Sequence, residues 1–324
     1  MTLITTLTPD VLAPATQPTL YFIGVTTGSS SIQRVFPRWA EHLGLRDARL
    51  QGIDLPLHAP AEQYRAVVEF IANDPLSLGA LVTTHKLDLF AACADLFDEI
   101  DPFARLMGET SCISKRDGAL VCHAKDPISS GLALDAFLGD DYWSSGRGSE
   151  ALCLGAGGST IAMSWYLTRP DAGANRPERL IVTNRSAERL DHIRSIHESL
   201  ETTTRFEYVL VPSPEENDRV LQSLAPGALV VNATGLGKDA PGSPLTGAAV
   251  FPRDAIAWDL NYRGDLVFLD QARAQPVERG VRVEDGWVYF VHGWTQVIAE
   301  VFHIDIPTSG AGFDALSALA RATR

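Results

Sequence analysis

A glycine cluster between two apolar segments is the feature of this chain with the clearest chemical meaning. Residues 151–154 are typical of a buried parallel strand, and apolar residues resume at helical spacing after the cluster. Gly155 and Gly157 allow a tight turn and the close approach of a pyrophosphate, and Gly158 lets a helix start near the strand. Backbone N–H groups at that helix start, with Ser159 in its first turn, are typical phosphate ligands. We therefore predict a dinucleotide site.

The next predicted strand tests this interpretation. Residues 180–183 form a short apolar run that ends in Asn184, Arg185 and Ser186, and a helical pattern follows with Ser186 as its N-cap. An acidic residue at this strand end binds the ribose 2′-hydroxyl of NAD, whereas an arginine accommodates the 2′-phosphate of NADP. Arg185 therefore predicts NADP, with Arg189 as a second candidate. The alternative is that Arg185 is a solvated surface side chain.

Composition favours an enzyme of two domains. The 324 residues are 45% hydrophobic and 21% charged, enough for two cores of ordinary size, and the net charge of −13 argues against a nucleic-acid partner. The sequence shows no signal peptide and no apolar run long enough to span a membrane, so we expect a cytoplasmic protein. Neither the four cysteines nor the eight histidines have metal-ligand spacing. We expect reduced thiols and no metal.

Strand and helix patterns alternate twice along the chain, as two α/β domains require. An acidic run at 215–218 is predicted to be a solvated face, and a glycine-rich turn at 139–148 to join the domains. The predicted strands are 19–25, 50–55, 79–83, 151–154, 180–183, 206–211, 228–232 and 255–259, and the predicted helices include 33–43, 61–72 and 128–138.

The order of several short segments resembles the shikimate/quinate dehydrogenase family over nearly the whole chain. Each segment is degenerate alone, but the ordered set is fairly specific. The segments are GVTTGSSSIQ (24–33), GALVTTHK (79–86), GETSC (108–112), Asp117-Gly118, Asp126, the glycine turn, NRS (184–186), VNAT (231–234), DLNY (259–262) and GWVY (286–289).

The resemblance implies an N-terminal α/β substrate-binding domain over 1–128, completed by 290–324, and a Rossmann-type NADP-binding domain over 129–289. It further implies that the C-terminal helices return to the first domain. In that family a lysine after the Val-Thr strand and an aspartate after the Asp-Gly turn form the catalytic pair. By position these are Lys86 and Asp126. Ala233 and Thr234 join the expected cofactor contacts.

A lysine and a carboxylate suit the implied chemistry. When a hydride leaves a carbinol carbon, the hydroxyl proton must also leave, so a positioned base is required. A lysine serves if a cleft lowers its pKa, and a nearby carboxylate can orient it or share the proton. Lys86 is the candidate acid/base, and the sequence leaves open whether Asp126 orients a hydroxyl or shares the proton.

The expected substrate contacts depart from the family pattern. The first carboxylate-binding serine is matched by Ser30, but the second falls on Ile32 unless Ser31 replaces it. A buried partner left without a hydrogen bond costs roughly 1–3 kcal/mol, so the loss of hydroxyl-binding groups indicates a changed substrate. Leu81 and Ser111 stand where the family has asparagines, Lys125 stands where it has a threonine, and Gly293 or Trp294 stands where it has a glutamine. Gln296 lies about one turn further along. The other expected substrate contacts are Thr83 and Tyr262.

The sequence leaves three alternative functions open. The first is an NADP-dependent oxidoreductase acting on a small cyclic alcohol or ketone other than shikimate, as a monomer or homodimer. The second is an authentic shikimate or quinate dehydrogenase with a divergent pocket. The third is a non-catalytic protein that senses a ligand or cofactor, which the retained Lys86 and Asp126 disfavour.

Overall fold

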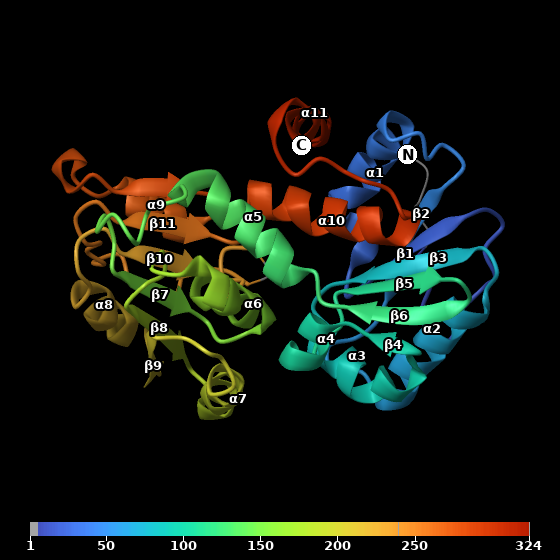
Figure 1. Cartoon of the computed structure of the whole chain (residues 1–324), viewed down its shortest axis with the longest axis horizontal. Coiled ribbons are helices and arrows are strands. Elements are labelled where there is room, and N and C mark those ends of the chain that lie inside the picture. The colour runs from blue at the N-terminus through green and yellow to red at the C-terminus, as the bar shows by residue number, and fades with distance from the viewer. Residues whose placement is uncertain (1–5, 239, 324) are drawn as a thin grey trace. The chain divides into compact units, whose positions relative to one another are not determined.

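The chain consists of two compact units in the computed structural model, which describes residues 6–238 and 240–323. The first unit combines Met1–Lys125 with Val291–Arg324, and the second is Asp126–Phe290. Each unit contains one six-stranded sheet (Figure 1). Residues 1–5, 239 and 324 of the predicted domain ranges lie outside the described part of the chain. The substrate-binding and NADP-binding roles of the units remain predictions.

The sheet of the first unit has the strand order β2-β1-β3-β5-β6-β4. Its core strand β1 pairs in parallel with both β2 and β3, and all six β1 residues are buried, as expected for a strand covered on both faces. The sheet then turns antiparallel at β5 and β6. The strands are β1 (Thr19–Gly24), β2 (Arg49–Asp54), β3 (Ser77–Val82), β4 (Glu99–Ile100), β5 (Cys112–Arg116) and β6 (Ala119–His123).

The β5–β6 hairpin is absent from the predicted strands. Asp117 and Gly118 connect the two strands with φ of +51° and +87°, the conformation of a two-residue type I′ turn. An Asp-Gly pair between β-prone runs is a recognised hairpin signal. The sequence therefore contained the information needed to find these strands.

Helices from both ends of the chain complete the first unit. The indole N–H of Trp39 donates to the Leu316 carbonyl at 2.8 Å, and Phe36 packs on Phe302 with ring centroids 6.4 Å apart. The prediction that the C-terminal helices return to the first domain is confirmed. The helices are η1 (Thr27–Ser29), α1 (Ile32–His42), α2 (Ala61–Asn73), α3 (Lys86–Cys93), η2 (Ala94–Leu96), α4 (Pro102–Met107), α10 (Trp287–Phe302, from Val291 onward) and α11 (Gly310–Arg321).

The second unit has the doubly wound order that the sequence predicted. Its strands are all parallel in the order β9-β8-β7-β10-β11-β12, with the direction of winding reversing between β7 and β10. Ligands of such sheets bind outside the carboxyl ends of the strands at this reversal. The strands are β7 (Glu150–Leu154), β8 (Arg179–Asn184), β9 (Arg205–Leu210), β10 (Leu229–Asn232), β11 (Ile256–Asp259) and β12 (Arg282–Glu284).

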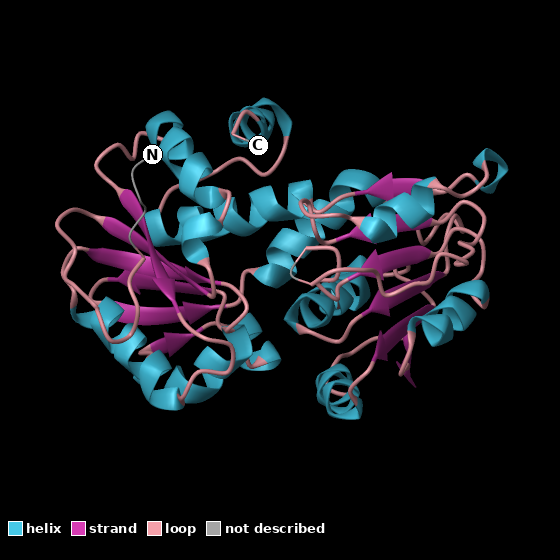
Figure 2. Cartoon of the chain, turned by 180° about the vertical axis from the view of Figure 1, so that it is seen from behind, coloured by secondary structure: helices cyan, strands magenta, loops and turns pink. Residues whose placement is uncertain are grey.

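Helices cover both faces of this second sheet. α5 and α6 pack against each other on one face (Figure 1), and the view from behind shows helices on the other (Figure 2). Every helix in the described part of the chain is too short or too polar to span a membrane. The helices are α5 (Asp126–Leu138), α6 (Gly158–Thr168), η3 (Pro170–Ala172), α7 (Ala187–His197), α8 (Pro214–Gln222), α9 (Val267–Arg273) and η4 (Val277–Arg279).

The prediction of a solvated acidic face at 215–218 is wrong for Asp218. This side chain is 7% exposed, and its carboxylate accepts hydrogen bonds from the backbone N–H (3.1 Å) and the hydroxyl of Thr246. Charge alone predicted exposure, whereas these bonds compensate the burial of the carboxylate. Asp218 thus fixes the loop after β10 to α8.

A buried histidine joins three elements of the second unit. The imidazole of His197 on α7 lies 2.7 Å from the Ser164 hydroxyl and 2.9 Å from the Tyr208 hydroxyl, and it stacks on Phe206 at 3.9 Å. Burial lowers the pKa of His197 from 6.5 to about 3. The imidazole therefore stays neutral in the folded unit at pH values where the unfolded chain binds a proton.

This difference predicts an acid-sensitive stability. As the pH falls from 6.5 toward 3, the unfolded chain gains a proton that the folded unit cannot accept, so stability is lost. Urea unfolding at pH 7 and pH 5 should show that His197→Gln loses about 2 kcal/mol less than the parent over this interval. His192→Gln, at an exposed position of the same helix, is the control. An equal loss in the parent and in His197→Gln would contradict the assignment.

Candidate functional site

The glycine turn lies where the carboxyl ends of β7 and β10 meet. Gly155 has φ of +110°, and a Cβ atom there would lie 2.8 Å from the Ala233 carbonyl oxygen. Its N–H donates to the Thr183 carbonyl of β8 at 2.9 Å. Only glycine combines this backbone conformation with so close a neighbour. The turn therefore brings the segment after β7 against Ala233, another predicted cofactor residue.

The start of α6 has the features of a phosphate site. Gly157 is the N-cap and provides no side-chain bond to the first turn, which consists of Gly158, Ser159 and Thr160. A Cβ atom at Gly157 would meet nothing within 4 Å. The first N–H groups of a helix lack partners within the helix and attract anions. The residues present thus fit a pyrophosphate.

The predicted 2′-phosphate segment follows β8. The Asn184 side chain accepts a hydrogen bond from the Ser186 N–H at 2.9 Å, and the Ser186 hydroxyl accepts one from the Arg189 N–H at 3.3 Å. Ser186 is the N-cap of α7, as predicted. Arg185 and Arg189 are both exposed. The segment therefore presents two guanidinium groups from a fixed turn.

A buried network fixes the loops after β10 and β11. The side-chain amide N–H of Asn232 donates to the Asp259 carboxylate at 3.1 Å, and the Thr234 hydroxyl donates to the side-chain oxygen of Asn232 (Oδ1) at 2.6 Å. Asp259 also accepts from the Asn261 N–H at 2.9 Å. Burial raises the pKa of Asp259 to about 6, although these bonds favour the carboxylate. The network holds Thr234, a predicted cofactor residue, at the strand ends.

Asp126 is the first residue of α5 and is 7% exposed. Its carboxylate accepts a hydrogen bond from the Tyr289 hydroxyl at 3.2 Å, and the same hydroxyl lies 3.3 Å from the Ser159 hydroxyl. Sequence reasoning did not assign Tyr289 to the site. The tyrosine lies 163 positions from Asp126, and no local pattern links them. Asp126 and Ser159 are thus brought together through a residue that only the fold reveals.

Tyr262 belongs to an aromatic cluster at the end of β11. Its ring centroid lies 4.4 Å from that of Phe290 and 5.7 Å from that of Trp287. Tyr262 is only partly buried. The cluster therefore fixes the orientation of its ring while leaving part of the side chain accessible.

In the first unit, the loop after β1 carries Ser30 and is attached to β2. The Thr27 N–H donates to the Asp54 carboxylate at 2.8 Å, and the Ser30 N–H donates to the Thr27 carbonyl at 3.2 Å. Ser30 and Ser31 are partly exposed, but Ile32 is completely buried in the inner face of α1. A ligand at this loop can therefore reach Ser30 and Ser31, while Ile32 remains in the core.

Lys86 begins α3 at the carboxyl end of β3. Thr84, two residues before it, has φ of +42°, and the Nδ1 atom of the buried His85 lies 3.0 Å from the Tyr64 hydroxyl. Burial lowers the pKa of His85. The Thr110 N–H donates to the Lys86 carbonyl at 3.0 Å. Thr83, also at this strand end, is partly buried and donates to the Ile23 carbonyl at 3.3 Å.

Ser111 is held by the protein backbone. Its hydroxyl accepts a hydrogen bond from the Lys125 N–H at 2.6 Å and donates to the His123 carbonyl at 3.4 Å. The Lys125 ammonium forms an ion pair with Glu300 of α10 at 2.6 Å. Burial opposes ionisation of Glu300, but this bond and the neighbouring His123 outweigh it and hold the pKa of Glu300 below its usual value. Ser111 and Lys125 thus connect β5, β6 and α10.

The family resemblance leaves two positions in α10, Gly293 and Trp294, for the expected glutamine. Trp294 is 5% exposed and packs on Phe22 with ring centroids 5.0 Å apart, whereas a Cβ atom at Gly293 would meet nothing within 4 Å. Gln296 is partly buried and lies three residues further along, on the same side of the helix as Gly293. Of these two positions, only Gly293 has space for a longer side chain, whereas the Trp294 side chain already fills part of the core.

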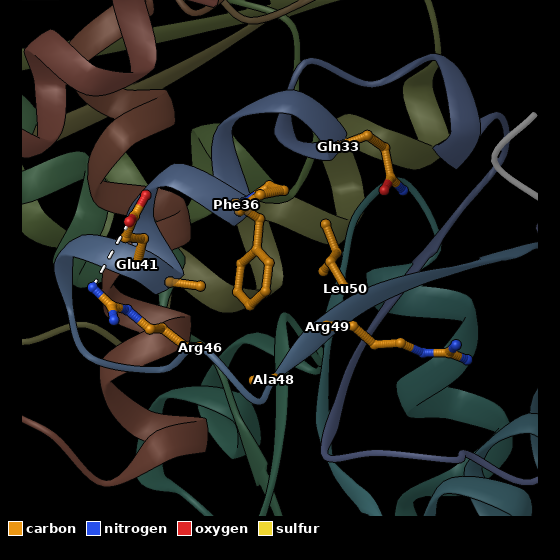
Figure 3. A pocket seen from close by; sticks show the side chains of 9 residues that line it. Gln33, Phe36, Glu41, Arg46, Ala48, Arg49 and Leu50 are labelled. Carbon is orange, nitrogen blue, oxygen red and sulfur yellow. Dashed lines mark ion pairs between the residues drawn. The ribbon is translucent and has the colours of Figure 1, made fainter. Parts of the chain in front are cut away.

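A cavity of about 330 Å³ lies elsewhere in the first unit, between α1 and β2 (Figure 3). Phe36 and Leu50 line it, and Glu41 and Arg46 form an ion pair of 3.8 Å at its edge. None of the predicted site residues lines it. Within the described ranges, no group of three His, Cys, Asp or Glu side chains could hold a metal ion.

The relatives that sequence comparison finds include several shikimate dehydrogenases. No family model matches the chain. It is 24% identical over 236 residues to shikimate dehydrogenase (NADP(+)) of Lactococcus lactis subsp. cremoris, covering 72% of this chain and 76% of the relative.

Solved structures share the fold. Shikimate dehydrogenase from Aquifex aeolicus matches with a TM-score of 0.69 at 19% identity, covering 96% of this chain and 99% of that one. Quinate dehydrogenase from Corynebacterium glutamicum, solved in complex with NAD, matches with a TM-score of 0.71 at 18% identity, covering 94% and 99%. The ordered motifs, the sequence relatives and the shared α/β fold agree, and the chain is similar to shikimate and quinate dehydrogenases.

Proposed function

We propose that the protein is an NADP-dependent oxidoreductase that interconverts a small cyclic alcohol and its ketone, with a substrate other than shikimate. One observation carries the proposal most strongly. Asp126, the candidate catalytic carboxylate, is connected through Tyr289 to Ser159 in the first turn of α6, next to the open space above Gly157. A carboxylate for proton chemistry thus adjoins a turn that fits a pyrophosphate.

The nucleotide contacts come from the carboxyl ends of β7, β8 and β10. When bound, NADP(H) supplies or accepts the hydride. The α6 N–H groups bind the phosphates, and Arg185, supported by Arg189, pairs with the 2′-phosphate. The Lactococcus relative is named for NADP(+), which supports this choice.

The proton chemistry is proposed for Lys86 and Asp126. Lys86 takes the hydroxyl proton when the alcohol is oxidised and returns it when the ketone is reduced. Asp126 accepts a hydrogen bond from the substrate hydroxyl and thereby orients it, or shares the proton.

The proposal of a substrate other than shikimate rests on the polar side chains that would bind the hydroxyl groups of shikimate. Leu81 is apolar and 6% exposed, Ser111 is bonded to the backbone, and Gly293 offers no polar group. Lys125 is paired with Glu300. A substrate with fewer hydroxyl groups leaves fewer polar atoms without partners in such a site. Authentic shikimate or quinate oxidation and cofactor sensing without catalysis are the competing functions.

Replacing Lys86 tests the catalytic role. Lys86→Ala should lower kcat by at least about 100-fold, because general acid–base catalysis typically contributes about 10²–10⁴-fold. The affinity for NADPH should change much less. Asp88→Asn, in the same helical turn, is the control. Steady-state kinetics and nucleotide fluorescence measure the two effects, and an unchanged kcat would remove Lys86 from the mechanism.

Filling the space at Gly157 tests the nucleotide site. The extended backbone of Gly157 (φ −92°, ψ −177°) suits valine, so Gly157→Val should fold normally. Its side chain would occupy the expected position of the pyrophosphate and weaken NADPH binding by roughly tenfold or more.

Gly247→Val provides a matched control for this experiment, because a Cβ atom at Gly247 also meets nothing within 4 Å. Calorimetric titration should show parent-like NADPH affinity in this variant. Retained affinity in Gly157→Val, with both variants folded, would reject the assignment of the turn.

Restoring polar groups tests the substrate proposal. The parent should oxidise shikimate poorly, and Leu81→Asn combined with Gly293→Gln should raise kcat/KM for shikimate. Gly293→Gln alone serves as the control for changes in the helix. Nicotinamide absorbance with shikimate, quinate and less hydroxylated cyclic alcohols gives the comparison. Efficient shikimate oxidation by the parent would favour the second function, and NADP binding without any turnover would favour the third.

A further inference from the structure

We propose that Tyr289 is a positioning residue that orients the Asp126 carboxylate and links it to the first turn of α6. The inference deepens the proposed function and rests on it for the role of Asp126. The three side chains that carry it, Asp126, Ser159 and Tyr289, all belong to the second unit.

The hydrogen-bond chain has one possible direction when Asp126 is a carboxylate. A carboxylate only accepts hydrogen bonds, so the Tyr289 hydroxyl must donate its single proton to Asp126. The Tyr289 oxygen then accepts from the Ser159 hydroxyl. Ser159 is also a proposed phosphate-binding residue. The chain therefore connects the proposed nucleotide turn to the carboxylate.

Aromatic packing holds Tyr289 in this position. Its ring contacts Trp258 edge to face, with centroids 6.0 Å apart, and Trp258 contacts Phe137 of α5 at 5.3 Å. Trp258 is 1% exposed. Because Phe137 and Asp126 share helix α5, the packing fixes the phenol relative to the carboxylate that it binds.

Tyr289→Phe removes the hydroxyl and keeps the ring. Aspartate labelled with ¹³C at the carboxyl carbon reports the environment of Asp126, whose resonance is identified by its loss in Asp126→Asn. The resonance should move in Tyr289→Phe. Ser159→Ala should move it in the parent but not in the Tyr289→Phe background, because Ser159 acts through the phenol.

The structure offers a matched control. The Tyr166 hydroxyl on α6 donates to the Asp135 carboxylate on α5 at 2.6 Å, outside the proposed site. Tyr166→Phe removes the same kind of contact between the same two helices. It should leave the Asp126 resonance and kcat unchanged.

A double-mutant cycle completes the test. Tyr289→Phe should lower kcat about tenfold, as expected for one hydrogen bond to a charged group, with NADPH affinity within about threefold of the parent. In the Asp126→Asn background it should change kcat by less than about twofold. An unmoved Asp126 resonance, or equal losses in both backgrounds, would overturn the proposal. Failure to bind NADPH would instead refute the proposed function, and the resonance would still test Tyr289.

Discussion

The close approach of β7 and β10 at their carboxyl ends is the constraint on which the candidate site depends. A side chain at Gly155 would collide with the Ala233 carbonyl, and φ of +110° excludes most other residues. Because the chain can turn so tightly there, α6 begins at the reversal point of the sheet. The position of Ser159, and through Tyr289 that of Asp126, follows from this turn.

Different forces shape the candidate residues of the two units. In the second unit, aromatic packing and a buried Asn232–Asp259 network hold polar groups at the strand ends. In the first unit, polar residues at comparable strand ends are bonded to the protein itself, as Ser111 is to the Lys125 N–H. The proposed nucleotide turn thus retains accessible polar groups, while the proposed substrate positions have lost several. This contrast is the physical basis for proposing a retained cofactor and a changed substrate.

The sequence predicted the features that local patterns encode. The strand at 151–154, the glycine turn and the Ser186 cap depend on residues close in the chain, and the structure has all three. The contact between Tyr289 and Asp126 joins residues 163 positions apart, so no periodicity could predict it. The family pattern assigns Ile32 to the substrate contacts by its position, whereas the structure buries its side chain on the inner face of α1. The positions of Lys86 and Asp126 came from the family resemblance, and their roles remain predictions.

The nucleotide preference of the purified protein tests the central claim most directly. The quinate dehydrogenase with the same fold was solved with NAD, whereas Arg185 after β8 indicates NADP in this chain. Calorimetric titration with NADP⁺ and NAD⁺ at low ionic strength should give at least about tenfold tighter binding of NADP⁺, the effect of one charge-assisted phosphate contact. Equal affinity for the two nucleotides, or binding of neither, would contradict this account of the site.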